Sequence, residues 1–150
     1  MHLVPVLNFL AILFGGLLAG VEFAVHYGLR KPTETIDMRS QLILRQAMVR
    51  RLRILVPALF VPTAVFGIAI TVMSGTSDLI FRSIALIALL VWVIIRVIGT
   101  VPINSATLEW SVDAPPSDWK ARVDHAERFH SVGAWAAVLA FVMFLIPTIF

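Results

Sequence analysis

The chain has 150 residues, of which 59% are hydrophobic and only 14% charged, and its formal net charge is +3. Soluble globular domains carry about 25% charged residues, so this composition excludes an ordinary soluble fold. The absence of cysteine excludes disulfides, iron–sulfur clusters and thiol redox chemistry. The basic balance does not indicate nucleic-acid binding, because the arginines flank apolar segments, where basic residues set membrane orientation and attract anionic headgroups.

Four apolar segments are each long enough to cross a bilayer, which takes about 20 residues of helix. We expect spans at 4–27, 54–73, 79–100 and 132–149. The first segment lacks a positively charged start and is longer than the apolar part of a signal peptide, so we expect it to be retained. The pattern predicts an all-α fold over 1–150, a single integral membrane four-helix bundle with cytoplasmic helical extensions.

The first span and the connection after it contain helix-ending and helix-starting signals. Gly28 followed by Pro32 is expected to end the first helix. Thr33 is expected to cap a second helix that runs directly into the second span. Pro57 and Pro62 predict kinks within that span, which neighbouring helices can tolerate.

Two further connections contain turn signals. Residues 74–78, Ser-Gly-Thr-Ser-Asp, predict a short turn that makes the second and third spans an antiparallel hairpin. Residues 115–119, Pro-Pro-Ser-Asp-Trp, predict a turn and an N-cap, from which a helix continues through Arg128 into the fourth span. Trp110 and Trp119 have the character of interfacial anchors.

The basic residues predict the orientation of the chain. Connections 30–53 and 101–131 carry nearly all of them, so the positive-inside rule places both connections in the cytoplasm and both termini outside. The cluster at 50–53 is most simply an orientation and headgroup anchor, and Arg82 is the one charge that disagrees. We expect an integral protein of a bacterial inner membrane, surrounded by membrane lipids.

The first span contains an ionisable pair, Glu22 and His26, near its cytoplasmic end. A carboxylate within a membrane helix costs a few kcal/mol or more, so it usually has a partner and often a function. Helical spacing places Gly15, Ala19, Glu22 and His26 on one face. The adjacent face has the GxxxG pattern of residues 16–20, which permits close helix contact and a homo-oligomer.

Two other spans bring polar residues to the same depth. The third span carries Arg96 and Asn104 at its cytoplasmic end, and the fourth begins beside Glu127 and His130. Three segments that are distant in the sequence thus place polar side chains at one level. His125 lies on a different helical face from His130 and is expected to be solvated.

These residues support more than one interpretation. Glu22 and Arg96 could form a buried ion pair that only locks two helices together. Glu127 and His130 have the Glu-x-x-His spacing of metal sites in helix bundles. Together with Glu22 and His26 they could supply two oxygen and two nitrogen ligands, a set suited to iron, copper or zinc. A haem between His26 and His130 is a remoter alternative.

Several short motifs resemble those of a known family. The segment Gly99-Thr100-Val101-Pro102-Ile103-Asn104 continuing to Trp110, with Pro115–Trp119, Glu127–His130 and the opening Leu18-Ala19-Gly20, resembles the small four-span membrane-protein family of unknown function that includes fungal anthrone oxygenases. The resemblance implies oxidation of an anthrone carbon to a quinone carbonyl with dioxygen. The positions that match the family pattern are Asn104, Trp119, Arg128 and His130. The resemblance does not define a cofactor.

The sequence therefore favours a membrane-embedded oxidoreductase, a monooxygenase similar to anthrone oxygenases, that acts on an apolar or aromatic small molecule at the cytoplasmic side. Dioxygen would be its co-substrate. His130 or His26 would act as general base, since imidazole can titrate near neutral pH. Arg96 and Asn104 would stabilise the enolate oxygen. The alternative is a non-catalytic membrane scaffold or a small-molecule-binding component.

Overall fold

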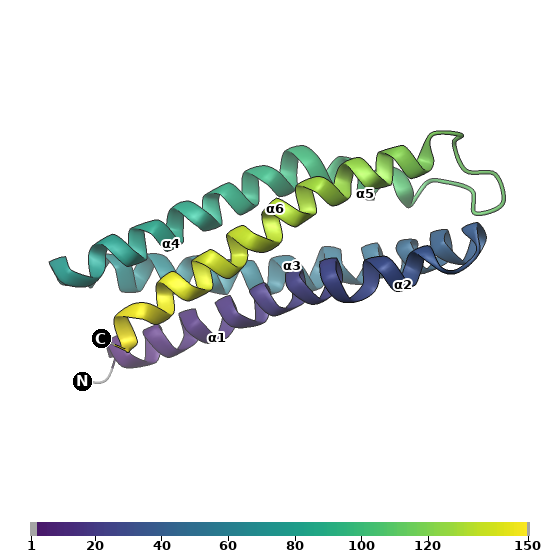
Figure 1. The fold of residues 1–150 in the computed structure, drawn as a ribbon. Helices are drawn as coiled ribbons and strands as arrows, with labels where there is room; N and C mark the ends of the chain where they lie inside the picture. The colour runs from purple at the N-terminus through teal and green to yellow at the C-terminus, as the bar shows by residue number, and fades with distance from the viewer. Residues whose placement is uncertain (1–2, 150) are drawn as a thin grey trace.

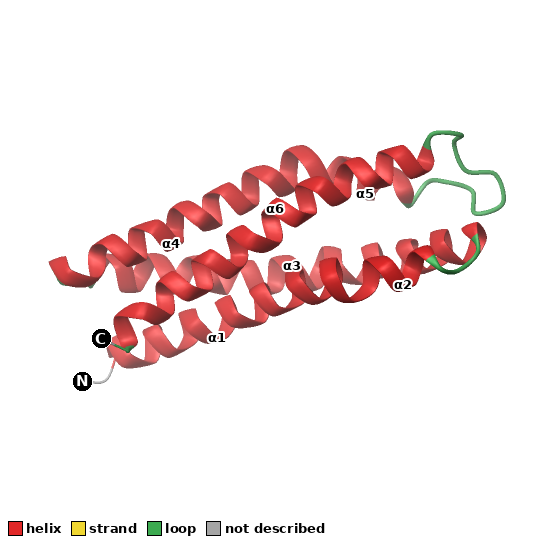
Figure 2. Cartoon of the chain, viewed as in Figure 1, coloured by secondary structure: helices red, strands yellow, loops and turns green. Residues whose placement is uncertain are grey.

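The computed structural model describes residues 3–149, and this range contains helices and no strand. The helical elements, in chain order, are α1 (Leu3–Phe23), η1 (Ala24–Leu29), α2 (Arg30–Glu34), α3 (Met38–Val72), α4 (Thr76–Ile95), η2 (Arg96–Thr100), α5 (Val101–Thr107), α6 (Trp119–Leu145) and η3 (Ile146–Thr148). They form four long rods that run side by side (Figure 1). Connections 35–37 and 108–118 lie at the end of the bundle opposite the α3–α4 turn (Figure 2).

Each of the four rods is long and apolar enough to cross a membrane. Large apolar side chains cover the outside of the bundle; Val72, for example, is 80% exposed and Ile98 68%. This is the surface expected of helices that face lipid, because a soluble protein of this size does not expose so much contiguous apolar area. The predicted all-α, four-helix membrane bundle is confirmed.

Small residues line the contacts between the rods. Ala85 and Ala88 of α4 and Ala137 and Ala140 of α6 are all buried, and α4 and α6 pack along much of their length. Helix α1 packs in the same way against both α3 and α6, whereas α3 and α4 contact each other less. Small side chains allow this close approach, which drives helix association where lipid removes the hydrophobic effect. The bundle is therefore least closed between α3 and α4.

The first rod is longer than its sequence predicts. Gly28 does not end it; the backbone continues through the π-helical η1 into α2 and ends at Glu34. The Thr33 hydroxyl donates to the carbonyl of Leu29 at 2.6 Å, so Thr33 lies inside this helix and the prediction that it caps the next one is wrong. Pro32 is tolerated because the carbonyl with which its ring would clash, four residues earlier, lies in the wider π turn.

Asp37 is the residue that caps α3. Its carboxylate accepts a hydrogen bond from the backbone N–H of Ser40 at 3.1 Å, and the side chain of Ser40 first, then this backbone N–H, lower the pKa of Asp37. From there α3 is a single helix of 35 residues that contains both Pro57 and Pro62. The prediction of a helix continuous with the second span is confirmed, with its start moved to Met38.

The α3–α4 hairpin is confirmed, and its turn binds the one charge that disagrees with the orientation rule. The buried guanidinium of Arg82 donates to the carbonyl of Ile70 at 2.8 Å and to the Ser74 hydroxyl at 2.6 Å. It also pairs with Asp78 at 3.2 Å. Arg82 thus satisfies carbonyl and carboxylate oxygens at the end of one helix and the start of the next.

Helix α6 begins at Trp119, as the proline-rich turn predicts, and continues through Arg128 into the fourth span. The Asp118 carboxylate does not cap it; it accepts from Arg122 Nε at 2.8 Å. The connection before α6 is held to α3 by the buried Gln46, whose amide donates to the carbonyls of Thr107 and Trp110 at 3.0 and 2.9 Å.

Candidate functional site

Two π-helical segments border the polar cluster. His26 lies in η1, and Arg96 is the first residue of η2. Each segment precedes a proline, Pro32 or Pro102, whose clashing carbonyl four residues earlier falls inside the widened turn. Short π segments are rare and occur frequently at functional sites, because the extra residue redirects the side chains of the turn. The chain therefore has two π-helical turns with redirected side chains beside one cluster.

The centre of the cluster is Glu22, which is completely buried. One carboxylate oxygen accepts from Arg96 Nη2, and the other lies 2.9 Å from His130 Nε2. The contact with His130 is close but is not an aligned hydrogen bond. Three elements that are distant in the sequence, α1, η2 and α6, thus meet at one carboxylate, as the sequence predicts.

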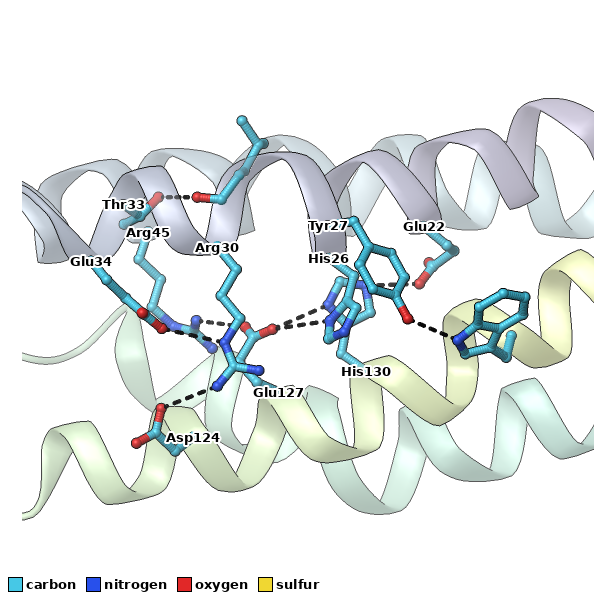
Figure 3. A network of polar contacts seen from close by, with 12 residues as sticks. Glu22, His26, Tyr27, Arg30, Thr33, Glu34, Arg45, Asp124, Glu127 and His130 are labelled. Carbon is cyan, nitrogen blue, oxygen red and sulfur yellow. Dashed lines mark hydrogen bonds and ion pairs between the residues drawn. The ribbon is translucent and has the colours of Figure 1, made fainter.

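A second carboxylate joins the two histidines. His26 Nδ1 lies 3.7 Å and His130 Nδ1 3.6 Å from the same atom, Glu127 Oε2. The two imidazole rings meet edge to face, with centroids 5.6 Å apart. Figure 3 shows both rings directed towards Glu127, with Glu22 on the far side of His130. All four candidate metal-ligating residues are therefore in one cluster.

Arg45 completes this cluster, although the sequence does not single it out as a site residue. Its guanidinium donates to Glu127 Oε1 at 3.2 Å and to Asn104 Oδ1 at 3.0 Å. Only 16% of its side chain is exposed. In the sequence it is one of many basic residues of a cytoplasmic connection. One feature of the sequence does indicate that Arg45 faces the bundle. It follows Leu42 by three residues and so lies on the helix face that also carries the buried Gln46.

A cleft of about 460 Å³ opens beside the cluster, between α3 on one side and α4, η2 and α5 on the other. Its volume lies within the range of about 300–1,000 Å³ that is typical of small-molecule sites. The apolar wall includes Phe60 and Trp92, whose rings stack at 4.8 Å. The polar side chains that line the cleft near the cluster are Arg45, Arg96, Asn104, Glu127 and His130.

A second, smaller cavity of about 90 Å³ lies across the Arg45–Glu127 contact, and both residues line both cavities. Its wall includes Arg30, which approaches Asp124 at 3.8 Å and Glu34 at 3.4 Å. Figure 3 shows this ladder of alternating charges leading from Glu34 towards the histidines. The Arg45–Glu127 ion pair therefore separates a charged vestibule from the largely apolar cleft.

The remaining predicted residues fall outside the cluster. His125 is exposed, as predicted, and its ring contacts Phe129. Arg128 is also exposed, and Trp119 is half-buried at the wall of the smaller cavity. Of the four positions that match the family pattern, Asn104 and His130 line the cleft, whereas Trp119 and Arg128 do not.

Comparisons of the chain with protein-family models, with curated proteins and with solved structures find no significant match.

Proposed function

We propose that this chain is a membrane-embedded oxidoreductase, similar to anthrone oxygenases, that oxidises an apolar aromatic molecule with dioxygen. The observation that carries the proposal is the composition of the 460 Å³ cleft. Part of its lining is apolar and aromatic, and another part presents guanidinium, amide and imidazole groups. A planar, largely apolar molecule with one polar oxygen complements both parts.

The substrate would reach the cleft from the bilayer. The cleft lies between α3 and the α4–η2–α5 rod, where the bundle is least closed. By the positive-inside rule the end with connections 35–37 and 108–118 would be cytoplasmic, so the cleft would open at the level of the inner leaflet. An apolar substrate concentrates in that leaflet, so the site would meet it at a high local concentration.

The aromatic and the polar side chains of the cleft would together orient the substrate. The stacked pair of Phe60 and Trp92 would contact an aromatic ring system through the ring edges that line the cleft. Arg96 would direct its positive charge at the substrate oxygen. Asn104 would donate to the same oxygen through its amide NH₂, because Arg45 already occupies the amide carbonyl oxygen. Both groups would stabilise negative charge as it develops on that oxygen.

The reaction would begin with loss of a proton from an acidic C–H beside the carbonyl. His130 is suited to accept it, because its Nε2 faces Glu22 and its Nδ1 is left as the basic atom. His26 would take or relay the proton through the Glu127 carboxylate. The carbanion would then react with dioxygen, so that one CH₂ group and one O₂ yield one carbonyl and one water.

The alternative is a scaffold or a non-catalytic binding component. The ion pair between Glu22 and Arg96 favours it, since such a pair can serve only to lock helices. A scaffold does not require the adjoining cleft, however. We therefore rank catalysis first, and ligand binding without turnover second.

The test uses anthrone itself as the probe, with protein reconstituted in lipid nanodiscs and anthraquinone formation followed by chromatography. His130→Ala and His26→Ala are expected to lower the rate at least about 10²-fold, the usual contribution of a positioned acid–base group. His125→Ala is the matched control, because this exposed imidazole lies on the same helix as His130. Parental rates in all three folded variants would exclude the proposal.

A further inference from the structure

We propose that His26, Glu127 and His130 form a binding site for a single divalent first-row transition-metal ion, with Glu22 as the carboxylate that positions His130. This inference goes beyond the proposed function, because the oxidation described above needs no metal. It also revises the expected set of four ligands. Glu22 is no longer a metal ligand but the residue that orients one of the ligands, His130.

The spacing of the three ligand atoms fits one ion. One oxygen of Glu127 and one nitrogen of each imidazole all lie within 4.8 Å of one another. The two nitrogen–oxygen distances are 3.7 and 3.6 Å. Metal–ligand bonds of about 2.0–2.1 Å place tetrahedral ligand atoms about 3.3–3.4 Å apart. The two nitrogen–oxygen pairs therefore need to close by only a few tenths of an ångström, and rotation of the imidazole side chains would bring the two nitrogens to the same spacing.

One buried nitrogen of the cluster has no hydrogen-bond partner and faces the proposed site. His26 is 8% exposed, and its Nδ1 has no hydrogen-bond partner. Buried polar atoms of this kind are uncommon, because leaving one unpaired costs free energy. The atom faces the Glu127 oxygen and the His130 ring, as Figure 3 shows. A cation placed among them would give this nitrogen the partner that it lacks.

The surrounding contacts have the form of an outer shell. A metal-bound histidine usually has its second nitrogen held by a carboxylate or a carbonyl. Here Glu22 lies 2.9 Å from His130 Nε2, on the side away from Glu127. Arg96 holds the other oxygen of Glu22, and Arg45 holds the other oxygen of Glu127. Each of these contacts fixes a ligand while leaving its metal-facing atom free.

Charge and ligand type define the occupant. Two imidazoles and one carboxylate with open positions are the ligand set of non-haem iron(II) sites, and they also suit zinc or copper. The two nearby arginines already balance the two carboxylates. A divalent ion would therefore leave positive charge unbalanced, which favours an anionic ligand such as an enolate in the cleft. The two Nδ1 atoms converge on one oxygen, an arrangement that favours an ion over a planar haem.

Metal binding would use the same Nδ1 atoms that accept a proton in the metal-free mechanism. The loaded and metal-free proteins should therefore differ in their activity on anthrone. Metal binding is measured without substrate, so a protein that binds no metal would not contradict the proposed oxidation. A protein that does not oxidise anthrone would likewise not contradict the proposed metal site.

The experiment is a titration of chelator-treated, detergent-solubilised protein with Co²⁺, Fe²⁺ or Zn²⁺, with bound metal counted by elemental analysis after desalting. We expect about one ion per chain, and for Co²⁺ a visible absorption band with histidine nitrogen ligation. His26→Ala and Glu127→Gln should abolish stoichiometric binding. Glu22→Gln should weaken binding about 10–100-fold, the usual effect of losing an outer-shell partner.

His125→Ala is the control, and it should bind as the parent does. Absence of stoichiometric binding by the folded parent protein with all three ions would overturn the proposal. Binding that survives His26→Ala and Glu127→Gln unchanged would overturn it as well. Because the parent protein alone can give the first result, a variant that fails to fold does not prevent a decision.

Discussion

Towards each end of the bundle an arginine lies largely buried in an apolar rod, and the surroundings of the two arginines differ. At the α3–α4 turn, Arg82 is bound by a backbone carbonyl, a hydroxyl and the carboxylate of Asp78. At the other end, Arg96 pairs with Glu22 but also borders a 460 Å³ cleft with two imidazoles and a second carboxylate nearby. A buried charge alone therefore does not indicate function. Function is indicated when an open cavity lies beside the charge and when more titratable groups are present than the ion pair requires.

The largest expected effect is on catalysis. Arg96→Gln should lower the rate of anthrone oxidation about 10²–10³-fold, the loss that follows removal of a donor to a developing oxyanion. Arg82→Gln should leave the rate within about twofold of the parent. Both rates would be measured in nanodiscs at matched protein content. An equal loss in the two variants would remove the distinction between the two ends.

For the α3–α4 hairpin we expect a loss of stability without a loss of activity. Arg82→Gln should reduce the free energy of unfolding by about 1–3 kcal/mol, because the Ile70 carbonyl and the Asp78 carboxylate both lose a charged donor. Unfolding in denaturing detergent, followed by circular dichroism, measures this loss. Ser74→Ala is a milder control, since the carbonyl contact remains. A stability equal to that of the parent would mean that Arg82 does not hold the turn.

Close packing at η2 is expected to hold α6 in place. A methyl group on Gly99 would collide with the Phe129 ring, one residue before His130. Gly99→Ala should therefore cost about 1–3 kcal/mol by overpacking and also lower activity, because α6 carries two members of the cluster. Gly20→Ala is the control, since a methyl there meets nothing within 4 Å. An unchanged melting temperature for Gly99→Ala would show that η2 and α6 are free to separate.

The smallest expected effect concerns the cap of α3. The pKa of Asp37 is lowered by its hydrogen bond to Ser40, so the cap's contribution is complete above the ordinary pKa and is lost as pH falls through the lowered value. Asp37→Ala should speed amide exchange in the first turn of α3 near neutral pH. The difference from the parent should vanish in acid. Asp37→Asn should retain the cap at every pH; a loss as large as that of alanine would contradict this account.

The number of helices and the depth of their polar residues can be predicted from the sequence. Span lengths and charge positions predict four helices and the depth of each polar residue, and depth alone brings Glu22, Arg96 and His130 to one level. Depth does not determine how each helix is rotated or how far it extends. The π turns at η1 and η2 change the phase of the residues that follow, and short motifs do not signal them. For that reason the continuation past Gly28 was missed.

Contacts between helices set the remaining features of the site. Arg45 reaches Glu127 from the part of α3 that precedes the apolar span; the sequence predicts this extension, but it does not predict which partner Arg45 meets. The same contacts place Glu22 against the outer nitrogen of His130 and away from the two Nδ1 atoms. Composition defines which groups are present, and packing decides which atom of each group faces which partner.

The most direct test of a single reaction centre built from distant helices is a double-mutant cycle of Glu22→Gln and His130→Ala on the anthrone oxidation rate. Residues that act as one unit lose activity once, so the double variant should be about as slow as His130→Ala alone. If the two losses multiply, or if Glu22→Gln oxidises anthrone at the parental rate, the carboxylate and the imidazole do not work together.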